Sequence, residues 1–363
     1  MSESIDNKNI DIVASNDTQQ GKCPSCGGIL VYSPEREMLH CDYCGTDVAL
    51  DLTPAEVKEN DFTEWLQHSD MMCKEETVVA EVACGQCGAR TTFPENTTSF
   101  ACAFCGTPIV LNKSVQRRTW KPEYLLPFKV GKKICNDRFK KWASSRWFAP
   151  SEFARQLVAE KRMKGMYLPY WTYDADTVTD YSGQKGIYRQ VNRIVNGKTV
   201  SRTVIDWYPV SGSLKHQFDD VIVPASDSIP PEIANVLTNW DRKNYVVYNE
   251  QFVKGFLTEL YKKDFKECYG NAQKQMEGYI SAAIRSEIGG NQRQIYHQET
   301  SYANIKFKLV LLPVWLSAYR YKTKSYLFAI NGRTGQIFGQ RPWSIPKIVT
   351  LVIIIAAILL YLL

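Results

Sequence analysis

The sequence predicts an α+β fold, and three observations support this prediction. A pattern of four cysteines occurs twice within the first 105 residues, residues 113–345 mix strand-like and helix-like spacings of apolar residues, and residues 348–363 carry no charged side chain. We therefore expect two small cysteine-based modules, then an antiparallel α+β domain, then one C-terminal transmembrane helix.

The duplicated cysteine pattern predicts two structural metal sites. Each copy has two CxxC pairs separated by fourteen residues, and the second copy follows 61 positions later; the eight cysteines are Cys23, Cys26, Cys41 and Cys44, then Cys84, Cys87, Cys102 and Cys105. Four thiolates on two short turns match tetrahedral zinc, and such a metal stabilises a small module that has little apolar core. We predict two Zn²⁺ ions, one in a zinc ribbon at residues 21–48 and one in a second ribbon at residues 83–112.

Glycines and neighbouring residues refine this prediction. A glycine follows each CxxC pair and can adopt the positive φ that turns backbone N–H groups toward the sulfurs. A thioredoxin-like redox motif would be a single CxxC pair at the start of a helix, and disulfides are rare in a reducing compartment. Iron also occupies four-cysteine sites, so the choice between zinc and iron stays open. We expect His40, beside Cys41, to be a surface residue rather than a ligand.

The remaining segments differ in composition and periodicity. Residues 1–20 are polar and predict a disordered tail, and residues 49–82 predict an acidic helical connector. The α+β domain at residues 113–345 contains strand-like runs, Asn-Gly pairs typical of tight hairpins, and a long stretch with helical spacing; these are Tyr124–Val130 and Met166–Tyr181, Asn196-Gly197 and Asn331-Gly332, and Phe252–Ile288.

One phrase occurs twice in this domain, as Leu168-Pro169-Tyr170-Trp171 and as Leu312-Pro313-Val314-Trp315. Proline favours an edge-like strand, and we expect each tryptophan to pack behind its strand. The alternative is a ligand groove lined by Trp171, Tyr173, Trp315 and Tyr319.

The C-terminal segment at residues 346–363 predicts a membrane anchor. Twelve of the sixteen residues from Ile348 to Leu363 are Ile, Leu or Val, which favours insertion into a bilayer. Arg341 and Lys347 flank the run, and positive flanking charge marks the cytoplasmic side. We therefore expect a single-pass protein of the cell membrane with its N-terminal bulk in the cytoplasm. A buried terminal helix of a soluble oligomer is the alternative.

Charge divides the chain into two unlike parts. Residues 1–110 hold 6 Lys and Arg against 18 Asp and Glu, a difference of −12, whereas residues 111–363 hold 38 against 20, a difference of +18. An acidic module is a poor ligand for nucleic acid, which is bound through its phosphates, so we expect a protein partner with a basic face. From Thr300 onward there is no acidic residue, so this basic segment can contact anionic lipid.

The sequence lacks recognisable catalytic motifs. It contains neither GxxxxGK[ST] nor HExxH, and we expect the protein not to be an enzyme. Asp174, Asp176 and Asp180 follow a strand-like spacing, and a polar strand face is the simplest account of them. A cation site or an acid–base role is the alternative.

The paired CxxCG ribbons, the two proline phrases, and Asn331-Gly-Arg-Thr-Gly with Arg341-Pro-Trp-Ser resemble bacterial tail-anchored double zinc-ribbon membrane proteins. Members of that family occur beside SPFH or virion-core-like proteins and homologues of phage shock protein A, and are often labelled primosomal or helicase-like. The resemblance implies a non-enzymatic membrane-anchored adaptor that recruits cytoplasmic protein partners, in connection with envelope stress. A nucleic-acid-binding zinc-ribbon protein of replication or transcription is the alternative.

Overall fold

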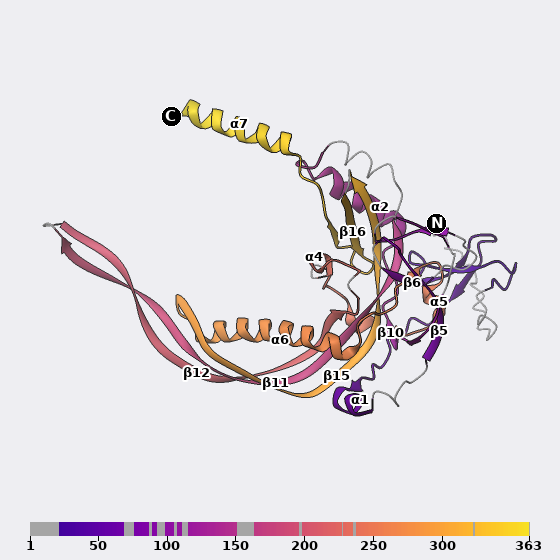
Figure 1. The fold of residues 1–363 in the computed structure, drawn as a ribbon, viewed down its shortest axis with the longest axis horizontal. Coiled ribbons are helices and arrows are strands. Elements are labelled where there is room, and N and C mark those ends of the chain that lie inside the picture. The colour runs from indigo at the N-terminus through magenta and orange to yellow at the C-terminus, as the bar shows by residue number, and fades with distance from the viewer. Residues whose placement is uncertain are drawn as a thin grey trace, which may run out of the picture.

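The computed structural model describes most of the chain and shows a long curved sheet with small sheets at one end (Figure 1). The described residues are 22–68, 76–86, 89–92, 99–104, 107–110, 115–150, 163–195, 198–226, 228–234, 237–321 and 324–362. The predicted tail at residues 1–20 lies outside them, and so does the Asn196-Gly197 turn itself.

Short elements make up the N-terminal part. The first small sheet consists of β1 (Leu30–Ser33), β2 (Met38–Cys41) and β3 (Asp47–Ala49). A second pairs β5 (Glu76–Ala83) with both β6 (Arg90–Thr92) and β9 (Val115–Trp120), and β7 (Ser99–Ala101) pairs with β8 (Pro108–Val110). Between the first two sheets, β4 (Asn60–Asp61) leads into α1 (Phe62–His68).

Within the described residues, nine strands form the large sheet, whose main path runs β12-β11-β15-β10-β13. Its bounds are β10 (Tyr124–Leu125), β11 (Lys164–Val195), β12 (Lys198–Pro224), β13 (Val246–Val247), β14 (Leu257–Thr258), β15 (Gln292–Tyr321), β16 (Lys324–Asn331) and β17 (Ile337–Gly339), with β4 added at one side. The connecting helices are α2 (Lys132–Ser144), α4 (Pro231–Ala234), η2 (Arg242–Asn244), α5 (Glu250–Val253), α6 (Phe265–Ile288) and α7 (Ile345–Leu362).

Helix α6 lies in the concave face of the curved sheet (Figure 1). Asp264 caps it through a capping box, since its side chain accepts from Glu267 N–H while Glu267 accepts from Asp264 N–H. The predicted helical stretch began at Phe252, but the helix begins only after this cap. Its buried side chains recur every three or four residues and pack on β11, β12 and β15; they are Phe265, Cys268, Ala272, Met276, Ile280, Ile284 and Ile288.

The two proline phrases pair with each other. Leu168 lies opposite Leu312 in the antiparallel register of β11 and β15, so both phrases lie in central strands, and the prediction of edge strands was wrong. Pro169 is tolerated in β11 because the strand changes partner on one side at this point. Strand β14 pairs with β11 as far as Tyr167 and β12 pairs with it from Tyr170 onward, so Pro169 lies between the two pairings.

The predicted fold class needs correction. Most strand pairs are antiparallel, and the large sheet curves into a half-barrel instead of forming the expected α+β layers. The predicted transmembrane helix at residues 346–363 was also wrong, because no helix among the described residues is long and apolar enough to cross a membrane. The C-terminal helix α7 has 18 residues and spans about 27 Å, short of a hydrocarbon core of about 30 Å.

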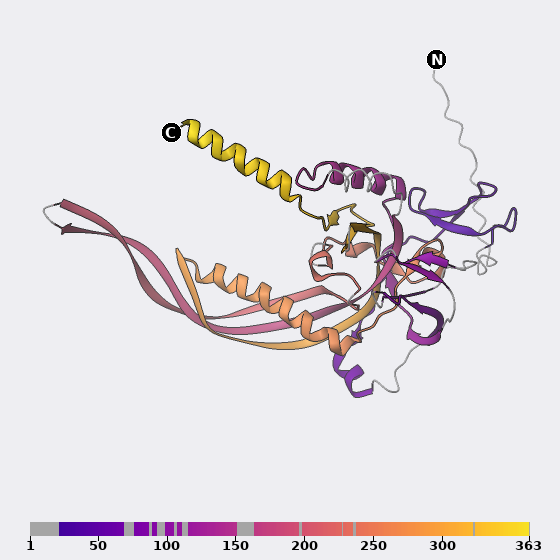
Figure 2. The ribbon, with the colours of Figure 1, turned by 45° about the horizontal axis from the view of Figure 1, so that its top comes forward.

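The β11–β12 hairpin extends beyond the rest of the sheet. Pairing of β11 with β15 ends at Gly186 and Gln292, whereas pairing with β12 continues to Val195 and Lys198. We call residues 185–195 and 198–208 the arm. The arm and α7 extend toward one end of the long axis, and the β1–β3 sheet lies toward the other (Figures 1 and 2).

Candidate metal centre

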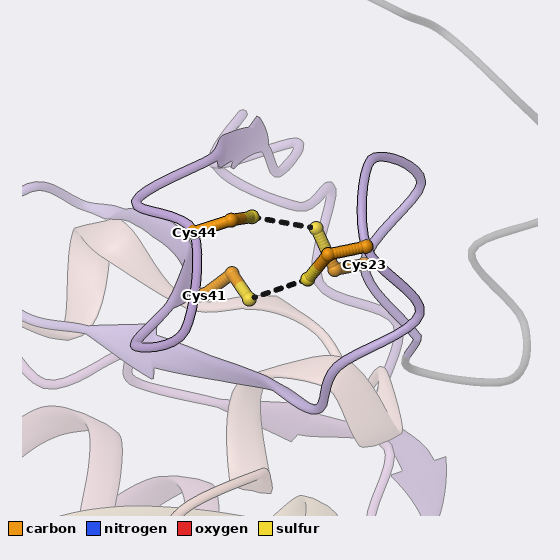
Figure 3. A group of neighbouring side chains, drawn as sticks. Cys23, Cys41 and Cys44 are labelled. Atoms are coloured by element: carbon orange, nitrogen blue, oxygen red, sulfur yellow. Dashed lines mark hydrogen bonds between the residues drawn. The ribbon is translucent and has the colours of Figure 1, made fainter.

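Four cysteines converge at the edge of the β1–β3 sheet. The Sγ atoms of Cys23 and Cys44 are 3.5 Å apart and those of Cys26 and Cys41 are 3.6 Å apart. Figure 3 shows the side chains of Cys41 and Cys44 pointing toward the turn that carries Cys23. All four sulfurs lie within 4.8 Å of each other. Tetrahedral zinc with Zn–S bonds of about 2.3 Å separates two sulfurs by about 3.8 Å. The spacing therefore suits a single four-coordinate metal ion.

Two backbone turns present these sulfurs. Cys23 N–H donates to Gly28 O at 2.6 Å and Gly27 N–H donates to Cys23 O at 2.8 Å, which closes the first CxxC turn. Gly27 and Gly45 have φ values of 71° and 78°, so the predicted positive φ is present after both pairs of the first copy. A Cβ on Gly28 would lie 3.3 Å from the sulfurs of Cys26 and Cys41, so a side chain there would crowd the ligands.

The thiols of Cys23, Cys26 and Cys44 have unlike affinities for protons. Burial acts to raise the pKa of Cys23, but hydrogen bonds from the backbone of Cys26 and Ser25 outweigh it and the pKa is lowered. The hydroxyl and backbone N–H of Thr46 lower the pKa of Cys44. The backbone of Gly28 acts to lower the pKa of Cys26, but the neighbouring thiols of Cys44 and Cys41 outweigh it and raise that pKa to about 12. Metal ligands must be deprotonated, so Cys23 and Cys44 are favoured as thiolates, whereas Cys26 would lose its proton when a metal binds.

His40 lies outside the sulfur group, but its side chain is half-buried and is not the surface residue that we expected. Its Nδ1 is 2.6 Å from Oδ1 of Asp47, and Nη1 of Arg36 is 2.6 Å from Oδ2 of the same carboxylate. Burial opposes ionisation of Asp47, yet these two partners lower its pKa. The interactions tie β2 to β3 and stabilise the strand that carries Cys41.

The first cysteine module packs directly on the main body of the protein. Tyr32 is buried, its hydroxyl donates to Phe128 O at 3.1 Å, and its ring contacts Phe252 edge-on at 5.6 Å. Leu30 and Leu39 are fully buried in the same apolar cluster as Phe128. A metal ion held by the four cysteines would therefore stabilise a module that is continuous with the core of the large sheet.

Of the two predicted cysteine groups, the part of the chain that the structure describes shows one, the group of four at Cys23, Cys26, Cys41 and Cys44. Cys84 and Cys102 are buried, and their N–H groups donate to Ala89 O and Thr107 O, each at 2.8 Å. The same five-residue spacing joins Cys23 to Gly28 in the first copy. Cys87 and Cys105 lie outside the described residues, so the second group stays a prediction.

A buried charged cluster was missed by the sequence analysis. Nζ of Lys308 lies 2.5 Å from Oε1 of Glu59 and 2.5 Å from Oδ1 of Asp220, and Asp174 Oδ1 accepts from Asp220 N–H at 2.7 Å. Asp174 was assigned to a polar strand face, but burial and then its hydrogen bond with Glu59 raise its pKa to about 7. The sequence contained one sign of this cluster, because Lys308 interrupts an otherwise apolar run from Phe307 to Val314.

Comparisons with known proteins give one match. No family model matches the chain, and no solved structure matches it. The chain is 25% identical over 330 residues to the uncharacterized protein YdjG of Bacillus subtilis (strain 168), a match that covers 90% of this chain and 91% of YdjG. The likeness extends over nearly the whole of both proteins.

Proposed function

We propose that this protein is a non-enzymatic adaptor that joins a basic protein partner to an anionic lipid surface. A zinc ion held by Cys23, Cys26, Cys41 and Cys44 would stabilise the end that contacts the protein partner, and the arm would contact the lipid. The observation that carries the proposal is the position of the acidic module and the basic arm toward opposite ends of the long axis (Figure 2).

The module end is acidic. Residues 22–61 contain three basic residues (Lys22, Arg36 and Lys58) against eight acidic ones, a difference of −5. Zinc bound by four thiolates would add a net −2 to this value. A surface of this charge attracts a partner with a basic face and repels nucleic acid.

The arm end is basic and amphipathic. Cross-strand partners share a face of a sheet, and the register places Tyr188 with Ile205 and Trp207 with Gly186 on one face. Ile194 lies on this face as well. The four large apolar side chains of this face, those of Tyr188, Ile194, Ile205 and Trp207, are all exposed. The register places the charged residues Lys185, Arg189, Arg193, Arg202 and Asp206 on the opposite face, which also exposes Ile187, Val200 and Tyr208.

This division suits the surface of a bilayer. Tyrosine and tryptophan favour the lipid interface, and long cationic side chains reach the headgroups while their stems stay apolar. Helix α7 adds exposed apolar side chains at the same end, among them Val352, Ile353 and Leu360. The resemblance to bacterial zinc-ribbon membrane proteins supports the same role.

Sedimentation with lipid vesicles tests this function. The full-length protein should pellet with vesicles of phosphatidylcholine and phosphatidylglycerol, and less with pure phosphatidylcholine or at high salt. Replacing Arg193 and Arg202 by Gln should weaken binding about thirtyfold, since each cation near an anionic surface contributes about 1 kcal/mol.

Matched replacements away from the arm provide the control. Lys243 and Lys274 are exposed, and Gln at both positions removes the same charge from η2 and α6. Equal loss of binding in both double variants, or binding that does not depend on phosphatidylglycerol, would reject the arm as the lipid-binding surface.

A further inference from the structure

A cavity of about 480 Å³ opens beside the segment that follows the metal module. Its wall includes Asn60 of β4 and Trp65 of α1 on one side, Trp120 and Glu123 on another, and Trp171 and Phe307 of the large sheet. Its volume lies within the range of about 300–1,000 Å³ typical of ligand pockets. No residue that the sequence analysis singled out as a metal ligand lines it.

The aromatic wall is held firmly in place. The rings of Trp65 and Trp120 meet edge-on with their centroids 5.1 Å apart. The rings of Trp120 and Trp171 are perpendicular, at an interplanar angle of 90°, with their centroids 5.8 Å apart. Trp171 is buried and its Nε1 donates to Lys263 O at 2.9 Å. Trp120 is the half-buried ring among these three. Phe265 stacks against it at 5.8 Å with an interplanar angle of 26°, so a ligand would contact the part of the indole that Phe265 leaves exposed.

One carboxylate in the wall is positioned by neighbours. Asn60 Nδ2 donates to Oε1 of Glu123 at 2.8 Å and also reaches Phe307 O at 3.3 Å. The backbone of Glu123 is fixed on both sides, since its N–H donates to Leu309 O at 3.1 Å and its O accepts from Tyr248 N–H at 2.9 Å. The pocket therefore combines an indole face with a carboxylate of fixed position.

We propose that this pocket binds the guanidinium group of an arginine side chain presented by the protein partner. This inference rests on the proposed adaptor function and names the chemistry by which the partner is recognised. A guanidinium is planar, stacks on an indole face, and donates two parallel N–H bonds to a carboxylate. The primary ammonium of lysine lacks the planar fork and is bound less well by this combination.

The pocket lining holds one acidic residue, Glu123, which can pair with a cationic group. Asn60 lies within residues 22–61, where eight acidic residues outnumber three basic ones. Lys121 also lines the pocket and is exposed, so it places one positive charge at the mouth. That lysine opposes a cationic ligand, and its removal should improve binding.

Capped pentapeptides with a central residue between glycines test the proposal on the intact protein. The central residue is arginine, lysine or citrulline. Citrulline keeps the shape of arginine without its charge. Binding is followed by tryptophan fluorescence and by the indole N–H signals in nuclear magnetic resonance spectra. We expect the arginine peptide to bind at least tenfold more tightly than the citrulline peptide, with lysine between them.

Three variants locate the site. Glu123→Gln keeps the shape of the side chain and should weaken the arginine peptide about tenfold, whereas Lys121→Gln should strengthen it about twofold. Trp120→Leu should remove the fluorescence response and weaken binding several-fold. Equal affinity for arginine and citrulline, no binding of either by the wild-type protein, or unchanged affinity in Glu123→Gln would overturn the proposal.

The comparison of peptides uses the wild-type protein, so it stands even where a variant folds poorly.

Failure of the pocket proposal can be distinguished from failure of the adaptor function. If capture of a basic protein partner is lost on Cys26→Ser but unchanged in Glu123→Gln, the pocket is excluded and the adaptor role survives. If the arginine peptide binds the pocket while the arm does not sediment with lipid, the pocket survives and the adaptor role does not.

Discussion

Lys308 and Glu59 form a buried ion pair, with Nζ of Lys308 2.5 Å from Oε1 of Glu59, across 249 positions of sequence. The pair joins the central strand β15 to the segment between the metal module and β4. The Lys308 side chain is 2% exposed, and Asp220 and Asp174 complete the cluster. Buried charges are costly unless they are paired, so this cluster fixes how the N-terminal segment sits on the sheet.

Replacing Lys308 by Met should strongly destabilise the protein. Three carboxyl groups would lose their common cation, and removing one partner of a buried ion pair costs about 3–5 kcal/mol. Urea unfolding followed by circular dichroism measures the change. Lys306→Met is the matched control, because Lys306 is exposed on the same strand and its loss should cost less than about 0.5 kcal/mol. Similar costs for the two variants would contradict this role for Lys308.

Asp174 should make stability fall as the pH rises through the neutral range. Burial, then the neighbouring Glu59, raises its pKa from 3.8 to about 7, so the folded state binds a proton more tightly than the unfolded state. A group with a raised acid pKa contributes stability that is present below the unfolded value and lost as the pH approaches the folded value. The window is therefore about pH 4 to 7.

Comparison with Asp174→Asn isolates this effect. As the pH rises, the wild type should lose unfolding free energy relative to Asp174→Asn. The loss should be at most about 1.4 kcal/mol per pH unit. Lys308, Glu59, Asp220 and the exposed Lys306 are present in both proteins, so their contributions largely cancel. A difference that is flat between pH 5 and 7 would show that Asp174 titrates normally.

Removing the metal should loosen the first cysteine module without unfolding the large sheet. Chelation should increase amide hydrogen exchange in residues 22–50, because zinc binding supplies much of the folding free energy of such a module. Cys26→Ser should lose the bound ion in metal analysis, whereas Cys135→Ala should keep it, since Cys135 is buried in α2 away from the sulfur group. Retention of the ion by Cys26→Ser would reject this metal centre.

The contact between the module and the body depends on Tyr32. Its hydroxyl donates to Phe128 O, and Tyr32→Phe should cost about 1 kcal/mol while keeping the ring packed against Phe252. Tyr32→Ala should cost about 3–5 kcal/mol, since it leaves a cavity in the shared apolar cluster. Thermal unfolding followed by intrinsic fluorescence distinguishes the two. A cost for Tyr32→Ala below that of Tyr32→Phe would mean that the module does not pack as described.

The sequence predicted features that depend on local spacing. Cys23 to Cys44 could be assigned to one site because ligand spacing is short-range, and the core face of α6 followed from its apolar periodicity. The pairing of Leu168 with Leu312 and the ion pair of Lys308 with Glu59 could not be predicted in this way, since nothing local specifies register between segments more than a hundred residues apart. The predicted bounds of the C-terminal helix, 346–363, lie within one residue of α7 at each end, but the inference that this helix crosses a membrane was wrong.

A fluorescent probe at each end of the molecule tests the adaptor account most directly. Ile194 in the arm is 79% exposed and Tyr43 in the cysteine module is 80% exposed, so an environment-sensitive fluorescent amino acid at either position starts in water. On vesicles containing phosphatidylglycerol, the account predicts a blue shift for the probe at position 194 and none at position 43. A shift at position 43, or none at position 194 while the protein is bound, would contradict it.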